Sequence, residues 1–168
     1  GVKKTVGAAK RAWYKRNFTV ENPHENGRVL LHFGASDWET DVFINGRHIG
    51  KHKGGYDPFT FDITEYIKSS GPQSIRVTAW DPTDKGEQPV GKQTHNPRSI
   101  WYTAVTGIWQ TVWLEYVPDS YIKDLEITPQ VDNKRVKVNV SAKEVTNEYS
   151  AKVIAKDAGV KVGESTGF

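Results

Sequence analysis

The chain has 168 residues, 23 Lys and Arg against 20 Asp and Glu, a formal net charge of +3, and neither Cys nor Met. The missing Cys excludes a disulfide scaffold, a thiolate metal site and a cysteine nucleophile. The nearly balanced charge does not indicate a nucleic-acid partner, and no apolar run approaches the ~18 residues of a membrane-spanning helix. At ~150 residues per domain, the length predicts one full domain and part of a second.

The first two thirds of the chain have the apolar alternation of short strands. Asn45-Gly46 between two apolar runs indicates a hairpin with a type I′ turn, because both central residues of that turn need a positive φ. A single helical turn is predicted over 62–67, before Gly71-Pro72. The predicted strands are Trp13–Val20, Arg28–Phe33, Asp41–Ile44, Arg47–Ile49, Tyr56–Ile63, Ser74–Trp80 and Ile108–Val117, the last being the longest.

A polar connection, residues 81–99, separates the last two of these strands and contains three prolines and two glycines. A connection of this length without regular structure is usually functional or disordered. We expect it to be mobile from Asp84 to Asn96 and to become ordered again at Ile100. Many short strands with almost no helix predict an all-β antiparallel sandwich or barrel.

Pro118-Asp119 marks a predicted boundary, so that residues 1–118 form one domain and residues 119–168 begin another. Three strands are expected in the second part, over 121–129, 135–142 and 150–156, and no closing strand is expected over 163–168. About 50 residues is half of an immunoglobulin-like sandwich of ~100. The chain also starts at Gly1 rather than Met, and we interpret it as a piece of a longer protein.

Two motifs suggest a family. Residues 42–64 contain VFINGRHIG followed by GGYDPFTFDIT, and residues 107–115 read GIWQTVWLE. In this order and spacing they resemble the N-terminal sugar-binding domain of family 2 glycoside hydrolases, which include β-galactosidases, β-glucuronidases and β-mannosidases. The resemblance implies a jelly-roll β-sandwich of the galactose-binding-like kind, followed by part of an immunoglobulin-like β-sandwich. It also implies a carbohydrate ligand and a catalytic barrel that is not in this chain.

The motifs describe a fold more than an activity, because their Asn-Gly and Gly-Gly pairs have structural roles in turns. Glycoside hydrolysis needs two carboxylates at a defined separation. The resemblance places that pair of glutamates in the barrel, and the acids of the long loop, Asp81, Asp84 and Glu87, are interpreted as solvated. We therefore assign no catalytic residue and expect the chain alone to be inactive.

The candidate sugar-binding residues are associated with the long loop. Asp81 follows Trp80 at a strand end, and in β-galactosidases of the family an Asp in a similar position hydrogen-bonds the terminal sugar. The alternative is an Asp that only initiates a turn before Pro82. Aromatic faces bind the C–H groups of pyranose rings, which makes Trp101 and Tyr102 candidates for sugar contact. Together with the polar side chains of the loop, the candidates are Asp81, Gln93, Trp101 and Tyr102.

Two further tryptophans have a different interpretation. If Ile108–Val117 is one strand with its aliphatic side chains toward the core, Trp109 and Trp113 face outward. Such a pair forms either a sugar platform or a surface that packs on a neighbouring domain, and we favour the interdomain surface.

The remaining polar clusters carry no predicted site. His48 and His52 would lie ~13 Å apart on a strand, too far to share a metal ion. Residues 51–55 lack the Gly-Lys-Ser/Thr ending of a phosphate loop. The basic residues between Lys3 and Arg16 are interpreted as a solvated arm. We expect no cofactor, leaving a structural Ca²⁺ and a homo-oligomer open.

Two alternatives to a domain of a larger enzyme remain open: a free-standing carbohydrate-binding module, and a protein-interaction sandwich without sugar affinity. The sequence does not determine the localisation, with a periplasmic or secreted protein favoured over a cytoplasmic one. The sugar and its linkage are not predicted.

Overall fold

The computed structural model describes residues 6–21 and 27–167 and divides the chain into two compact units, Gly1–Tyr116 and Val117–Phe168. The division lies close to the predicted boundary after Pro118. Regular structure is almost entirely β, which confirms the predicted class. In the described part of the chain the helical structure amounts to one 3-10 turn, η1, at Thr64–Tyr66, where a helical turn was predicted. None of the helical structure described is long and apolar enough to cross a membrane.

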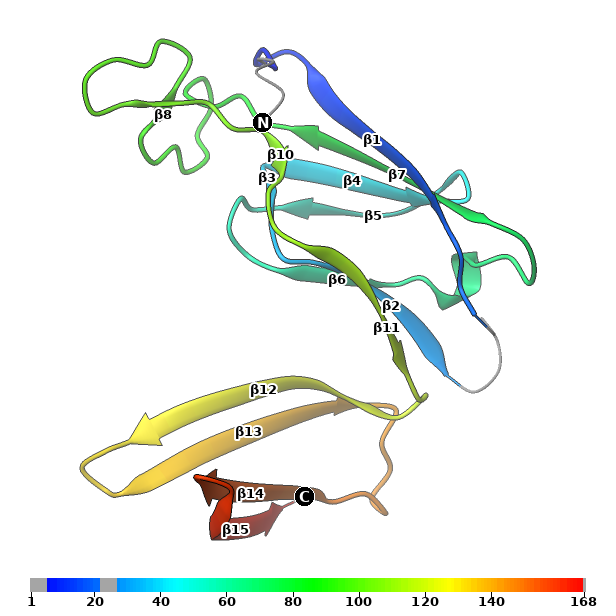
Figure 1. Ribbon diagram of the computed structural model, residues 1–168, viewed down its shortest axis with the longest axis vertical. Helices are drawn as coiled ribbons and strands as arrows, with labels where there is room; N and C mark the ends of the chain where they lie inside the picture. Colours follow the sequence, from blue (N-terminus) through cyan, green and yellow to red (C-terminus); the bar gives the residue numbers. More distant parts are fainter. Residues whose placement is uncertain (1–5, 22–26, 168) are drawn as a thin grey trace. The chain divides into compact units, whose positions relative to one another are not determined.

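The first unit contains two main antiparallel sheets (Figure 1). The four-stranded sheet has the order β1 (Arg11–Phe18), β7 (Gln73–Trp80), β4 (Glu39–Ile44), β5 (Arg47–Lys53). The three-stranded sheet has the order β11 (Val112–Val117), β2 (Arg28–Phe33), β6 (Phe59–Asp62). Non-consecutive strands are neighbours in both sheets, as expected for a jelly-roll sandwich.

The core of the first unit lies between these two sheets. Alternate residues of β2 and β4 point inward, since successive side chains of a strand face opposite sides. Phe33, Val42 and Ile44 are fully buried, and Phe33 stacks on Phe59 with ring centroids 4.6 Å apart. The buried cluster consists of Val29, Leu31, Phe33, Val42, Ile44, Ile63, Ile67 and Val77. This core includes Val77 of β7, the strand after which the long connection begins.

The predicted hairpin is present between β4 and β5. Asn45 and Gly46 have φ values of 50° and 85°, as a type I′ turn requires. The Asn45 side chain donates to the Tyr66 carbonyl (2.8 Å) and accepts from the Ser74 N–H (2.9 Å). The turn is therefore also attached to η1 and to the start of β7.

The predicted long strand over 108–117 is wrong. β10 (Gly107–Ile108) pairs with β3 (Ser36–Asp37), and β11 starts only at Val112 and pairs with β2. Between them, the N–H groups of Trp109 and Gln110 both point to the Ala35 carbonyl. The chain changes partner strand at this point, so the alternation assumed for Trp109 and Trp113 does not continue through residues 109–111.

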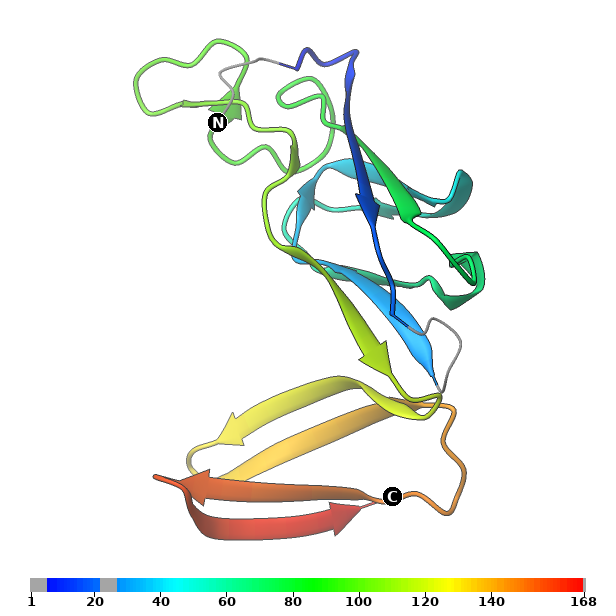
Figure 2. The same ribbon diagram turned by 45° about the vertical axis from the view of Figure 1, so that its right-hand side comes forward.

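The long connection after β7 is not structureless. β8 (Gln93–Thr94) pairs in parallel with β9 (Tyr102–Thr103), and the Tyr102 N–H donates to the Lys92 carbonyl (2.7 Å). The loop extends beyond the ends of the sheets in both ribbon views (Figures 1 and 2). It also contains the side-chain hydrogen bonds described below. The mobility expected for 84–96 stays a prediction.

The second unit consists of two antiparallel hairpins (Figure 2). β12 (Tyr121–Gln130) pairs with β13 (Arg135–Lys143), and β14 (Ala151–Asp157) pairs with β15 (Val160–Gly167). The expectation of no strand at the end of the chain is wrong, because Ala158 and Gly159 form a turn with positive φ values that leads into β15. Large apolar side chains stay exposed here, with Ile122 and Ile127 each 61% exposed.

Candidate functional site

Asp81 lies directly after β7 and is buried, with 3% of its surface exposed. Its Oδ1 accepts from the Thr83 N–H (2.7 Å), and its Oδ2 accepts from the hydroxyls of Thr83 (3.3 Å) and Thr106 (3.4 Å). These are the contacts of an Asp that stabilises a turn. A sugar contact by Asp81 stays a prediction, and the structure gives its side chain a clear structural role at the base of the loop.

A second carboxylate, Asp37 of β3, lies close to Asp81. Burial and the negative charge of Asp81 raise the pKa of Asp37 to about 6, while a hydrogen bond from the Gln93 side chain opposes this rise. Gln93 also accepts from the Val105 N–H through Oε1 (2.6 Å). The predicted sugar ligand Gln93 thus connects β3 to the far side of the loop. Sequence reasoning missed Asp37, because no local pattern distinguishes it from other acids at strand ends.

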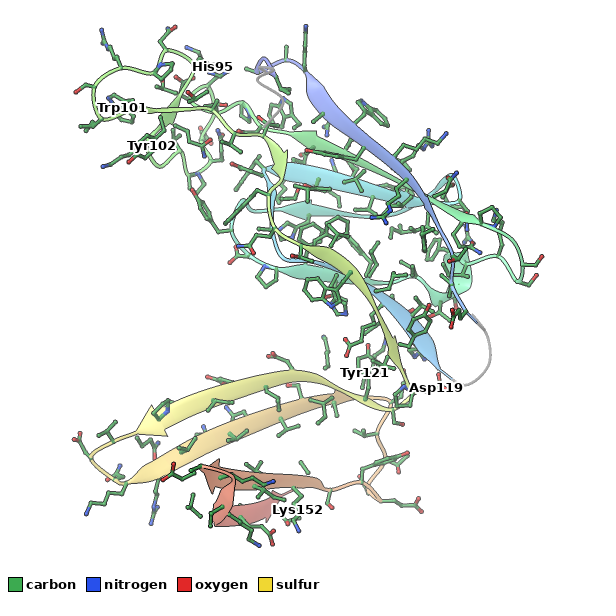
Figure 3. The ribbon with its side chains drawn as sticks, in the orientation of Figure 1. His95, Trp101, Tyr102, Asp119, Tyr121 and Lys152 are labelled. Atoms are coloured by element: carbon green, nitrogen blue, oxygen red, sulfur yellow. The ribbon has the colours of Figure 1, made fainter. Side chains whose placement is uncertain are left out.

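Two of the predicted sugar-binding residues line the same hollow. Gln93 and Trp101 contribute to a polar pocket of about 650 Å³ formed by residues 84–101. Trp101 and Tyr102 are 45% and 64% exposed, and both project from the loop (Figure 3). Tyr102 is opposite Gln93 in the β8–β9 pairing but does not line this hollow. Asp81 lies outside its lining as well.

The loop is held together by Asp84, which sequence reasoning had interpreted as solvated. Its carboxylate accepts from the Thr94 hydroxyl (2.6 Å) and the His95 N–H (3.2 Å), and contacts His95 Nδ1 (2.5 Å). The hydrogen bonds from Thr94 and then His95 hold the pKa of Asp84 well below its usual range. Asp84 therefore fixes the two sides of the loop relative to each other.

Trp109 is attached to the Gly-Gly segment that precedes β6. Its indole Nε1–H donates to the Gly55 carbonyl (2.7 Å), and its ring meets Tyr56 edge-on at 6.2 Å. It remains 47% exposed. Gly55 itself allows a close approach, since a Cβ there would lie 2.7 Å from a carboxylate oxygen of Asp37. Trp109 is thus an anchored, half-exposed ring on the side of the unit that carries Asp37.

Trp113 lies on the outer face of β11 and is 44% exposed. Its ring stacks on His32 of β2 with centroids 4.9 Å apart, and His32 Nε2 lies 3.0 Å from Glu115. Trp109 and Trp113 therefore occupy separate surroundings rather than one continuous platform. Their predicted role as an interdomain surface stays a prediction.

The side chains of the other polar clusters make contacts within the first unit that stabilise its strands. His48 contacts Asp41 (3.0 Å), and His52 stacks on Phe59 at 4.0 Å. The basic segment is not an arm from Arg11 onward, because β1 pairs with β7 and Arg11 donates to Glu39 (2.6 Å); Lys3 and Lys4 are outside the described residues. No group of three or more His, Asp or Glu side chains able to hold a metal was found among the described residues. A structural Ca²⁺ stays an untested prediction.

Comparison with known proteins identifies the first unit. A family model described as the sugar binding domain of glycosyl hydrolases family 2 matches residues 3–118. The chain belongs to this family. The resemblance based on the motifs at 42–64 and 107–115 is confirmed, and with it the β-sandwich of the first unit.

The relatives are larger enzymes. The chain is 30% identical over 155 residues to a β-galactosidase of Thermoanaerobacter pseudethanolicus, covering 89% of this chain and 20% of that protein. It is 28% identical over 139 residues to the β-glucuronidase of Canis lupus familiaris, covering 71% of this chain and 21% of the relative. Among solved structures, a β-glucuronidase from Ruminococcus gnavus in complex with D-glucuronic acid matches with a TM-score of 0.72 and 25% identity, over 94% of this chain and 29% of that one. The chain thus spans about a fifth of the length of each of these two curated relatives.

Proposed function

We propose that this chain is a non-catalytic carbohydrate-binding and scaffold region of a family 2 glycosidase that acts on β-linked sugars. Two facts support the proposal. The family model covers the first unit, and the chain corresponds to a fifth of relatives named β-galactosidase and β-glucuronidase. In this proposal the two catalytic carboxylates belong to a barrel elsewhere in the parent protein. The second unit is part of an immunoglobulin-like sandwich that lies, along the chain, between the first unit and that barrel.

The observation that carries the proposal is the folded polar loop with its hollow and its exposed indole. A ligand site is typically a cavity of ~300–1,000 Å³ with a few placed polar groups. The hollow beside Trp101 has this size and lies in a loop that extends beyond the sheets. In the parent enzyme, residues 81–103 would form part of the rim of the active site, and Trp109 and Trp113 would pack on the neighbouring domain.

The catalytic part of the proposal is tested with the purified chain and chromogenic β-galactoside, β-glucuronide and β-mannoside. We expect no hydrolysis above background, because glycoside cleavage needs two suitably spaced carboxylates and the proposal assigns both to the barrel. Turnover that survives repurification and disappears in Asp84→Asn or Glu87→Gln would contradict the proposal.

The scaffold part is tested in the parent enzyme. Trp101→Ala is expected to lower kcat/KM for its glycoside, while Trp13→Ala, a change of another exposed tryptophan on β1, serves as the matched control. Trp13 is 64% exposed and lies outside the loop. Equal activity of both variants and wild type would contradict the proposal that the loop forms part of the active-site rim.

One observation favours a second function, that of a carbohydrate-binding module that works without the barrel. The lining residues of the hollow all come from one loop, between residues 84 and 101, so the hollow could bind a sugar without a contribution from another domain. Titration of the chain with oligosaccharides distinguishes the two functions, since saturable binding at millimolar or lower concentration favours the module.

A further inference from the structure

The walls of the hollow are connected to one another by hydrogen bonds within the chain. Asp84 links the first part of the loop to Thr94 and His95 through three contacts of 2.5–3.2 Å. The β8–β9 pairing fixes Gln93 opposite Tyr102. A preorganised site loses less conformational entropy on binding than a flexible loop does. The lining residues are Asp84, Val90, Gln93, Thr94, Asn96, Arg98 and Trp101.

The hollow is lined by one carboxylate, Asp84, and one guanidinium, Arg98. The carboxylate of Asp84 is engaged by Thr94 and His95. Among the residues that the structure describes, the guanidinium of Arg98 makes no ion pair or hydrogen bond, although the Arg98 carbonyl accepts from the Trp101 N–H (3.0 Å). The hollow therefore offers a guanidinium whose hydrogen-bond donors are not used by the described residues of the loop.

The groups left available have complementary chemistry. The planar guanidinium of Arg98 can donate two parallel hydrogen bonds to a carboxylate or to a sulfate oxygen pair. The indole of Trp101 offers an apolar face to the C–H groups of a sugar ring, and the Asn96 amide can donate and accept hydrogen bonds with hydroxyls. A short turn, 98–101, brings the cation and the indole to the same wall.

We propose that this hollow binds a pyranose that carries an anionic group, either a carboxylate or a sulfate ester. The ring lies on Trp101, the anionic group pairs with Arg98, and Asn96 contacts a hydroxyl. The proposal rests on the proposed carbohydrate-binding function, to which it adds the ligand class and the specificity residue. The lining residues Asp84 and Thr94 bond to each other within the loop, so this part of the wall does not depend on the ligand.

The test uses the ¹⁵N-labelled 168-residue chain and nuclear magnetic resonance. Methyl β-D-glucuronide, glucose 6-sulfate and methyl β-D-glucoside are titrated separately, and the indole signal of Trp101 is assigned with Trp101→Phe. We expect saturable shifts of this signal with one or both anionic sugars, at concentrations about tenfold below those needed for the neutral glucoside. The first two sugars distinguish a carboxylate ligand from a sulfate ligand.

The matched variants are Arg98→Gln and Lys92→Gln, which remove one positive charge each from the same loop. Lys92 does not line the hollow. Arg98→Gln is expected to weaken binding of the anionic sugar at least about tenfold, because it removes a charge-assisted pair of hydrogen bonds, and to leave binding of the neutral sugar unchanged. Lys92→Gln is expected to change neither. Unchanged signals of residues outside the loop verify that both variants fold.

Several results would overturn the proposal. Equal affinity for the glucuronide and the glucoside, with no effect of Arg98→Gln, would exclude the anionic class and leave the carbohydrate-binding function intact. Equal shifts with acetate or sulfate ion alone would exclude a sugar ring as the ligand. Absence of any shift at Trp101 with all three sugars would exclude the site in this chain, whereas the proposed role at the active-site rim is tested separately by Trp101→Ala in the parent enzyme.

Discussion

Replacement of Asp37 by Asn is expected to stabilise the first unit at neutral pH. Burial and the charge of Asp81 raise the pKa of Asp37 from 3.8 to about 6. A carboxyl group with a raised pKa binds its proton more tightly in the folded state, so its ionisation above pH 6 opposes folding. The asparagine amide of the variant stays neutral at every pH and can still accept the hydrogen bond of Gln93.

The size of the effect follows from the shift. A shift of about two pKa units at about 1.4 kcal/mol per unit gives an upper value of about 3 kcal/mol. Because the side chain is only partly buried and solvent screens its charge, we expect about 2 kcal/mol at pH 7.5. The difference between variant and wild type should shrink as the pH falls toward 4, close to the unfolded-state pKa of 3.8, and vanish below about pH 3, where Asp37 is protonated in both states.

The assay is urea unfolding of wild type and Asp37→Asn at pH 4.0, 5.0, 6.0 and 7.5. The difference in unfolding free energy should rise through this range and level off above pH 6. Asp81→Asn is the control, because it removes the like charge and should move the titration midpoint of the Asp37 carboxyl to lower pH. A difference that is constant with pH, or a variant that is less stable than wild type at pH 7.5, would refute the reasoning.

Three further results are expected. Gly107→Ala should lower the free energy of unfolding by ~2 kcal/mol or more, measured in urea, because Gly107 has a φ of 100° and a Cβ there would collide with the Tyr14 hydroxyl. The control is Gly7→Ala, which should leave the free energy of unfolding unchanged, because a Cβ at Gly7 would meet nothing within 4 Å. Asp84→Asn should lower the protection of the loop amides against hydrogen exchange, relative to their intrinsic exchange rates. In wild type the same protection should be lost as the pH falls through the lowered pKa of Asp84. Unchanged protection would show that this carboxylate does not order the loop. The amides of Val117–Phe168 should exchange before those of the first unit, because many apolar side chains stay exposed there, and equal protection would contradict this.

The sequence was most informative where the local structure depends only on residues that are adjacent along the chain. The β4–β5 hairpin was predictable because Asn45-Gly46 can adopt two positive φ values at little cost. The Ala158-Gly159 turn has the same geometry, and the pair was not recognised because Ala is an uncommon residue with a positive φ. The missed strand β15 followed from the missed turn.

The break at residues 109–111 could not be predicted from periodicity. Ile108 to Val117 alternates like one strand, yet Gly107 and Ile108 pair with β3 whereas β11 pairs with β2. The interruption arises because the chain that follows β2 bends at Gly34 and Ala35, whose backbone groups bond to residues 109–111. Such a change of partner strand depends on how the strands are arranged in the sheets, which the sequence of one strand does not show.

The candidate site depends on strand register in the same way. Glu39 of β4 is opposite Trp80 of β7, and this register brings Asp37 and Asp81, one just before β4 and one just after β7, to the same end of the sheet. Sequence reasoning found Asp81 because it follows a strand, but it had no means of pairing it with a carboxylate 44 residues earlier. The aromatic residues of the loop were easier to find, since their chemistry identifies them individually.

The polar composition of the loop was interpreted as a sign of solvation, and the contacts show why composition alone is a poor guide. Asp84, Thr94 and His95 satisfy one another, and Gln93 satisfies both Asp37 and the Val105 N–H. The loop's polar side chains thus provide the hydrogen bonds that its backbone lacks in the absence of a long strand. Arg98 and Trp101 lie on the wall of the same hollow without being needed for this network. Because the hydrogen-bond network of the loop does not use these two side chains, they stay available to a ligand, as the proposed binding of an anionic sugar requires.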